Sequence, residues 1–155
     1  MKKIITLMLA FTLAFWCPTT ASAVASTDTT IVETFDDGSY IETKIEETSV
    51  SPTRSTTSTI SGKKTTTYKN SAGNAIWSVS VTGTFTYNGS SATCTKATAS
   101  ATSYNSNWKI SSSSASKSGA TAKATASAKK YADGTYIKTM TQSVTLTCSK
   151  NGTLS

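Results

Sequence analysis

The segment from residue 77 to residue 87 alternates between two kinds of side chain. Serine and threonine occupy the even positions, while the odd positions are mostly apolar. A period of two predicts a strand with one buried face and one solvated face. Gly83 falls among the odd positions, where it indicates a bulge or the close approach of a neighbouring strand. The large apolar residues of this strand are Trp77, Val79, Val81, Phe85 and Tyr87.

A second alternating segment, residues 120–129, places alanine at every even position. Alanine content alone would favour a helix, but the threonine, serine and lysine residues on the other parity favour a strand. Because alanine occupies little volume, a buried row of alanines indicates that large side chains press on it from an opposite layer. The candidates for these large side chains are Trp77, Phe85, Tyr104 and Trp108.

Glycine-containing turns separate the β-rich runs. Asp37-Gly38 and Asp133-Gly134 are strong hairpin signals, and Asn88-Gly89 marks a further turn. The first turn makes residues 24–50 a hairpin arm, which we expect to pack on the main sheet or extend it, because an isolated hairpin is marginally stable in water. We expect strands near residues 29–35, 39–46, 63–69, 75–87, 91–103, 107–112, 119–131 and 135–148.

The first 23 residues have the pattern of a secretory signal peptide. Two lysines precede an apolar run, and Ala21-Ser22-Ala23 supplies small residues for cleavage. Cys17 allows a rival interpretation as a lipoprotein cysteine, although Phe15 and Trp16 precede it where small residues are required. We therefore expect a secreted, extracellular chain that begins at residue 24 and has no transmembrane segment after removal of the signal peptide.

Cleavage leaves two cysteines, Cys94 and Cys148, in an oxidising compartment, where a disulfide is the natural interpretation. Closing a loop of about 54 residues stabilises a fold by up to roughly 4 kcal/mol. A nucleophilic cysteine or a zinc site is disfavoured because the chain has no histidine. The sequence thus predicts an all-β protein: a small antiparallel β-sandwich, immunoglobulin-like in general architecture, with an N-terminal hairpin arm and one disulfide.

Charge divides the chain after its signal peptide. Residues 24–50 hold seven acids and one lysine, whereas residues 51–155 hold twelve bases and one acid, Asp133. This change predicts an acidic arm (24–50), a Ser/Thr-rich linker (51–61) and a basic β-sandwich domain (62–155). The arm's charge either improves solubility or lets the arm dock on the basic domain, and the sequence leaves both alternatives open.

Enzyme chemistry finds little support in these residues. Histidine, the commonest general base, is absent, and the basic domain has a single acid where a glycosidase needs two. No serine stands in a nucleophile-elbow motif, and no glycine-rich loop is placed to hold phosphate. An autocatalytic lysine–asparagine crosslink needs a buried lysine beside an acid, and no residue of the sequence stands out as a candidate for either role. We expect a protein that is not an enzyme and that uses no metal or cofactor.

Binding chemistry finds more support. The basic domain favours an anionic partner such as a wall polymer, an acidic glycan or a membrane surface, while nucleic acid is not expected for an exported chain with one arginine. Lysines scattered among 58 serine and threonine residues also serve solubility, and the Thr-x-Thr rows resemble both an ice-binding array and the ordinary wet face of a sheet. Aromatic residues near strand ends are equally typical of a glycan platform and of a core. The candidate ligand contacts are Tyr104, Trp108, Lys109 and Tyr131.

Several stretches resemble a group of small exported Ser/Thr-rich β proteins of Gram-positive, largely clostridial, bacteria. They are residues 36–41, 77–79, 82–94, 108–111 and 144–149. The resemblance implies export and a β-rich fold with one disulfide, and it carries no catalytic residue to this chain.

These observations favour a secreted, non-catalytic, adhesion-like module that binds an anionic or glycan partner at the cell surface. One alternative is a structural or assembly component that self-associates by pairing its N-terminal arm with an edge strand of a neighbouring copy. Another alternative is a secreted antagonist or toxin-like factor.

Overall fold

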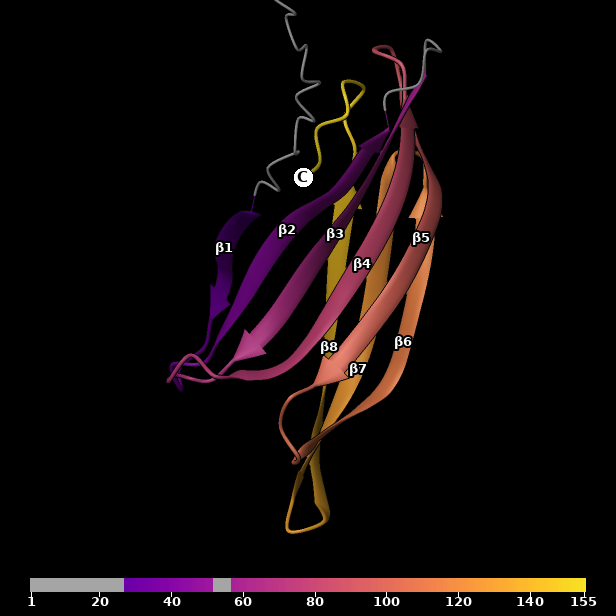
Figure 1. Ribbon diagram of the computed structural model, residues 1–155. Coiled ribbons are helices and arrows are strands. Elements are labelled where there is room, and N and C mark those ends of the chain that lie inside the picture. Colours follow the sequence, from indigo (N-terminus) through magenta and orange to yellow (C-terminus); the bar gives the residue numbers. More distant parts are fainter. Residues whose placement is uncertain (1–26, 52–56) are drawn as a thin grey trace, which may run out of the picture.

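A computed structural model describes residues 27–51 and 57–155 (Figure 1). The expected signal peptide with Cys17 and residues 52–56 of the expected linker lie outside the described residues. The described residues form eight β-strands and no helix. The strands are β1 (Thr27–Thr34), β2 (Tyr40–Ser51), β3 (Ser58–Lys69), β4 (Ala75–Tyr87), β5 (Ala92–Ser103), β6 (Trp108–Ser118), β7 (Thr121–Ala132) and β8 (Thr135–Thr147).

The strands form two antiparallel sheets. The first sheet has the order β1-β2-β3-β4-β5 and the second has the order β6-β7-β8, so each sheet is a meander of consecutive strands. The prediction of an all-β fold with two layers is confirmed. The strand order differs from that of an immunoglobulin domain, in which a Greek-key connection moves the chain between the sheets. The likeness to immunoglobulins is limited to two antiparallel layers.

Large side chains of the first sheet face the alanine row of the second sheet. Trp77, Val79, Val81 and Phe85 are fully buried on β4, and Ala122, Ala124, Ala126 and Ala128 are fully buried on β7. A methyl group built on Gly83 would stand 3.1 Å from the Ala122 side chain and 2.6 Å from the Phe85 ring. The expected close approach at this glycine is therefore confirmed. The small alanine side chains of β7 pack against the large side chains of β4, and this contact sets the spacing of the two layers.

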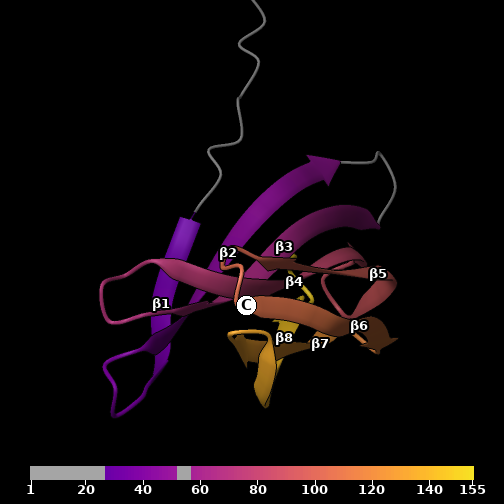
Figure 2. The same ribbon diagram turned by 90° about the horizontal axis from the view of Figure 1, so that it is seen from below.

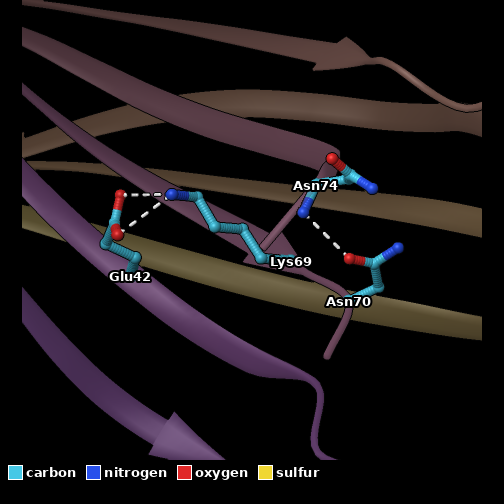
Figure 3. Close-up of polar contacts among 4 residues, drawn as sticks. All are labelled: Glu42, Lys69, Asn70 and Asn74. Carbon is cyan, nitrogen blue, oxygen red and sulfur yellow. Dashed lines mark hydrogen bonds and ion pairs between the residues drawn. The ribbon is translucent and has the colours of Figure 1, made fainter. Parts of the chain in front are cut away.

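The N-terminal hairpin belongs to the first sheet. Strand β2 pairs with β3 from Tyr40↔Lys69 to Ser51↔Thr59, so the expectation that the arm extends the main sheet is confirmed. Lys69 Nζ lies 2.9 Å from Glu42 Oε1 and donates a hydrogen bond to Oε2 at 3.0 Å (Figure 3). In the adjacent loop, the Asn74 amide donates to Asn70 Oδ1 at 2.8 Å (Figure 3) and fixes the β3–β4 turn. Opposite charge on β2 and β3 thus supports the pairing.

Aromatic rings connect the hairpin to the second sheet. The Tyr68 ring packs edge-on against Phe35 at 5.9 Å between centroids and against Trp108 at 5.8 Å. The Tyr68 hydroxyl donates to Ser39 Oγ at 3.0 Å. Because Phe35 follows β1 and Trp108 opens β6, this chain of rings joins the arm to both layers.

Three strands are longer than the alternation predicts. Strand β2 continues to Ser51, beyond the expected end near residue 46, and remains paired with β3. Strand β3 starts at Ser58, inside the expected linker, because Ile60 is buried in the core. Strand β6 continues to Ser118 although residues 111–118 are all exposed. Backbone pairing with β7 holds this part of β6, and its serine-rich sequence offers no apolar alternation from which to predict it.

Candidate binding surface

The β7–β8 hairpin projects beyond the rest of the sandwich (Figure 1). Its turn is Asp133-Gly134, with φ angles of 49° and 78°. Two successive residues with positive φ define a type I′ turn, whose twist matches that of the flanking strands. Residues 132–139 are all exposed, so the hairpin tip presents both of its faces to solvent.

The tip gathers two tyrosines and a lysine. Tyr131 and Tyr136 are cross-strand partners whose ring centroids lie 6.2 Å apart in an edge-to-face arrangement. The Lys109 Nζ lies 5.3 Å from the centroid of the Tyr131 ring, within the range of a cation–π interaction. We call Lys109, Tyr131 and Tyr136 the Tyr–Lys cluster.

A register shift follows the tyrosine pair along the hairpin. Lys130 pairs with Lys138, whereas the next residue of β7, Tyr131, pairs with Tyr136. Ile137 is therefore the extra residue of a β-bulge, which changes the face that Tyr136 would otherwise occupy. The Tyr136 hydroxyl shares a hydrogen bond of 3.0 Å with Thr139 Oγ1, which restrains the ring at its outer end.

The charge around the cluster is positive. Strands β6–β8 with their turns hold six lysines and one acid, Asp133, and none of these lysines forms an ion pair within the described residues. The nearest acid from the other sheet is Asp37, whose pKa is lowered by hydrogen bonds from Ser39 and, to a smaller extent, by the charge of Lys138. The second sheet therefore presents an excess of positive charge beside the exposed ring of Tyr136 and the half-buried ring of Tyr131.

The predicted ligand contacts separate into three places. Lys109 and Tyr131 belong to the Tyr–Lys cluster. Trp108 is only 5% exposed and packs against Tyr68, so its burial removes it from an exposed platform. Tyr104 is 59% exposed, but its hydroxyl bonds to Ser78 Oγ at 3.2 Å on the outer face of the first sheet, so it neither joins the cluster nor packs on the alanine row.

The sequence reasoning missed Tyr136, although a signal for it was present. A two-residue Asp-Gly loop makes Ala132 pair with Thr135, and the next pair outward is then Tyr131 with Tyr136. The predicted turn alone would have identified the tyrosine pair. The positions of Tyr104 and Trp108 carried no such signal, because the loop between β5 and β6 decides which face each one reaches.

The predicted disulfide is not formed in the structure. Cys94 and Cys148 are both buried but free. Each thiol donates instead to a nearby carbonyl, Cys94 to Lys96 O at 3.3 Å and Cys148 to Ser149 O at 3.4 Å. Burial raises the pKa of both thiols, and the charge of Cys94 raises that of Cys148 further.

The two cysteines nevertheless flank one turn. The Cys94 amide donates to Gly119 O at 2.7 Å, and the Cys148 amide donates to the next carbonyl, Ala120 O, at 3.0 Å. The β6–β7 turn therefore holds β5 on one side and the end of β8 on the other.

Within residues 27–51 and 57–155, no group of three or more cysteine, aspartate or glutamate side chains is placed to hold a metal ion. The same part of the chain contains no helix of the length and apolarity needed to cross a membrane. Comparisons with protein families, with curated proteins and with solved structures found no match.

Proposed function

We propose that the protein is a secreted, non-catalytic, adhesion-like module that binds an anionic or glycan partner at the cell surface. The observation that supports this proposal is the Tyr–Lys cluster on the projecting hairpin. It combines an exposed and a half-buried tyrosine ring, positive charge and a position clear of the body of the protein.

Each part of the cluster matches one kind of ligand group. The faces of Tyr131 and Tyr136 suit the apolar face of a sugar ring, and their hydroxyls suit its polar edge. Lys109 and its exposed cross-strand partner Lys129 suit phosphate or carboxylate groups repeated along a polymer. A polymer that carries both sugars and anions uses the whole surface.

Binding can be tested with two defined probes, poly(glycerol phosphate) and a neutral β-glucan, by isothermal titration. We expect the phosphate polymer to bind and its affinity to fall as salt is added, because salt screens the lysines. Binding only of the glucan, unchanged by salt, would restrict the partner to a neutral glycan. Binding of neither probe would contradict the proposal.

Substitutions locate the surface that binds. Tyr136→Ala should weaken binding about tenfold, in the range expected when one aromatic contact is lost. Tyr104→Ala is the matched control, because it removes an equally exposed tyrosine from the opposite outer face. Equal losses in both variants would show that the cluster is not the site.

We also propose that export to an oxidising compartment joins Cys94 to Cys148. The two thiols would lose two protons and pass two electrons to an oxidised thiol–disulfide partner, forming one S–S bond. Both thiols are buried beside the same turn, which supports this proposal. Bond formation requires each cysteine side chain to rotate away from its carbonyl partner. The intact mass of protein from culture medium should be lower by two hydrogens than the mass of the reduced chain.

If the bond forms, Cys148→Ser should lower the free energy of unfolding by a few kcal/mol, about 4 kcal/mol at most for a loop of this length. Chemical denaturation under oxidising and reducing conditions measures this loss. Identical denaturation midpoints of the parent protein under the two conditions would show that no bond forms.

A further inference from the structure

The first sheet is wider than the second. Strands β3, β4 and β5 contact the three strands of the second sheet, whereas β1 and β2 contact none of them. Figure 2 shows β1 and β2 lying to one side of β6–β8. Two strands of the first sheet therefore extend beyond the layer that covers the others.

A groove of about 520 Å³ runs beside these two strands. Val32, Ile45, Val144 and Leu154 supply its apolar lining. The residues that β1 and β2 contribute to it, Thr30, Val32, Thr43 and Ile45, carry no charge. One charged residue, Lys64 of β3, also lines the groove. Val32 is 64% exposed, so this face of β1 and β2 has no cover among the described residues.

Unpaired strand edges border the groove on both sides. Strand β1 is the edge of the first sheet, and β8 is the edge of the second sheet. The C-terminal residues pair with β8 only at Thr147 and Cys148, which leaves the edge from Thr135 to Leu146 without a partner in the described chain. Strands β1 and β8 run in opposite directions (Figure 1).

We propose that this side of the sandwich is the interface of a two-fold symmetric dimer, in which β1 of each copy pairs antiparallel with β8 of the other. A two-fold axis parallel to the strands places the first sheet of one copy in the same layer as the second sheet of the other. Each layer then contains eight strands, and the two uncovered strands of one copy lie over the two uncovered strands of its partner. Each copy thus covers the two strands that its partner leaves uncovered.

Charge selects this crosswise pairing over the pairing of like edges. Residues 27–51 contain seven acids and one lysine, while β6–β8 with their turns contain six lysines and one acid. Strand β1 carries two acids and no lysine, and Lys138 is the only charged residue of β8. Joining β1 to β1 would bring like charges together, whereas joining β1 to β8 brings opposite charges together. An isologous contact of this kind closes on itself and leaves neither of these edges open to further addition.

The proposal is independent of the Tyr–Lys cluster and can be tested by sedimentation velocity at micromolar concentration. The unmodified protein should sediment as a dimer. Val32→Glu places charge in the groove at both copies of the interface and should raise the dimer dissociation constant at least about 100-fold. Ile31→Glu is the matched control: Ile31 is 61% exposed on the same strand but does not line the groove.

A monomeric parent protein would overturn the proposal, as would a dimer that Val32→Glu leaves intact or that both variants disrupt equally. Circular dichroism of each variant establishes that it is folded. Both side chains are exposed, so neither substitution removes core packing.

Crosslinking then tests which edges meet. Single variants Thr29→Cys on β1 and Thr141→Cys on β8 are mixed and oxidised under conditions that leave the buried thiols unreacted. A crosslinked dimer should form in the mixture and not from either variant alone, since only the mixture places an introduced thiol on both paired edges. Crosslinks from a single variant would show like edges meeting and would refute the crosswise arrangement.

Discussion

Trp77 is the largest fully buried side chain among the described residues, and it connects the two layers. Its ring lies on the face of β4 that is turned towards the alanine row, and its Nε1 has no hydrogen-bond partner within the described residues. The ring therefore stabilises the fold through apolar contact and contributes no compensating polar interaction.

Trp77→Ala should lower the free energy of unfolding by about 3–5 kcal/mol, because a large cavity would remain opposite side chains that are already small. Urea denaturation measures the change. Trp77→Phe should cost less, since it keeps an aromatic ring and removes the unpaired N–H. A loss below about 1 kcal/mol for the alanine variant would mean that this ring is not core.

The two buried thiols make stability depend on pH when they are reduced. Burial holds the pKa of each thiol above its ordinary value in the folded protein, so the folded state binds more protons than the unfolded state once the pH exceeds about 8.5. In reducing buffer, the unfolding free energy of the parent protein should therefore fall above that pH relative to the Cys94→Ser/Cys148→Ser variant. A difference that stays constant from neutral to alkaline pH would contradict this expectation.

Burial could be predicted for residues inside regular strands but not for residues at strand ends. The alternation at Trp77, Val79 and Phe85 assigned each side chain to the correct face. Tyr104 and Trp108 stand four residues apart on either side of a crossing between sheets, and a tight loop directs one outward and the other inward. The free state of Cys94 and Cys148 also depends on side-chain rotation, which spacing does not encode.

At the scale of elements, the β7–β8 hairpin depends on one unusual backbone conformation. Gly134 has a φ of 78°, which an L side chain adopts only at a cost of about 1–2 kcal/mol. The same turn holds Tyr131 opposite Tyr136. The geometry of the turn and the geometry of the cluster are therefore linked.

Gly134→Ala should lower stability by about 1–2 kcal/mol and weaken binding of poly(glycerol phosphate), because a loosened turn disorders the tyrosine pair. Gly89→Ala is the matched control, since Gly89 has a similar φ of 82° and open space around it at a different turn. The control should lose comparable stability and keep its affinity. If the two variants bind with comparable affinity, the β7–β8 turn does not contribute to the binding site.

The turns and most strands could be predicted from their residues, because Asp-Gly pairs and alternation are local signals. The bulge at Ile137 and the exposed half of β6 could not, since both depend on pairing with β7. The Asp-Gly turn pairs Tyr136 with Tyr131, so this part of the candidate site had a local signal, whereas the bulge that follows it on β8 had none.

At the scale of the whole molecule, the two sheets differ both in width and in charge. The acidic hairpin forms the uncovered side of the wider sheet, and six lysines with a single acid occupy the narrower sheet that ends in the projecting tip. Charge segregation could be predicted by counting residues. The division into a five-stranded and a three-stranded sheet could not be predicted, because no local sequence signal marks the point at which the chain passes from one layer to the other.

The binding account can be tested most directly by NMR titration of the ¹⁵N-labelled protein with poly(glycerol phosphate). The account predicts that the largest amide shift changes fall at residues 109, 130–131 and 136–138, and that residues around Tyr104 on the opposite face change little. Changes centred on the first sheet, or spread evenly over all lysines, would contradict the Tyr–Lys cluster as the binding site.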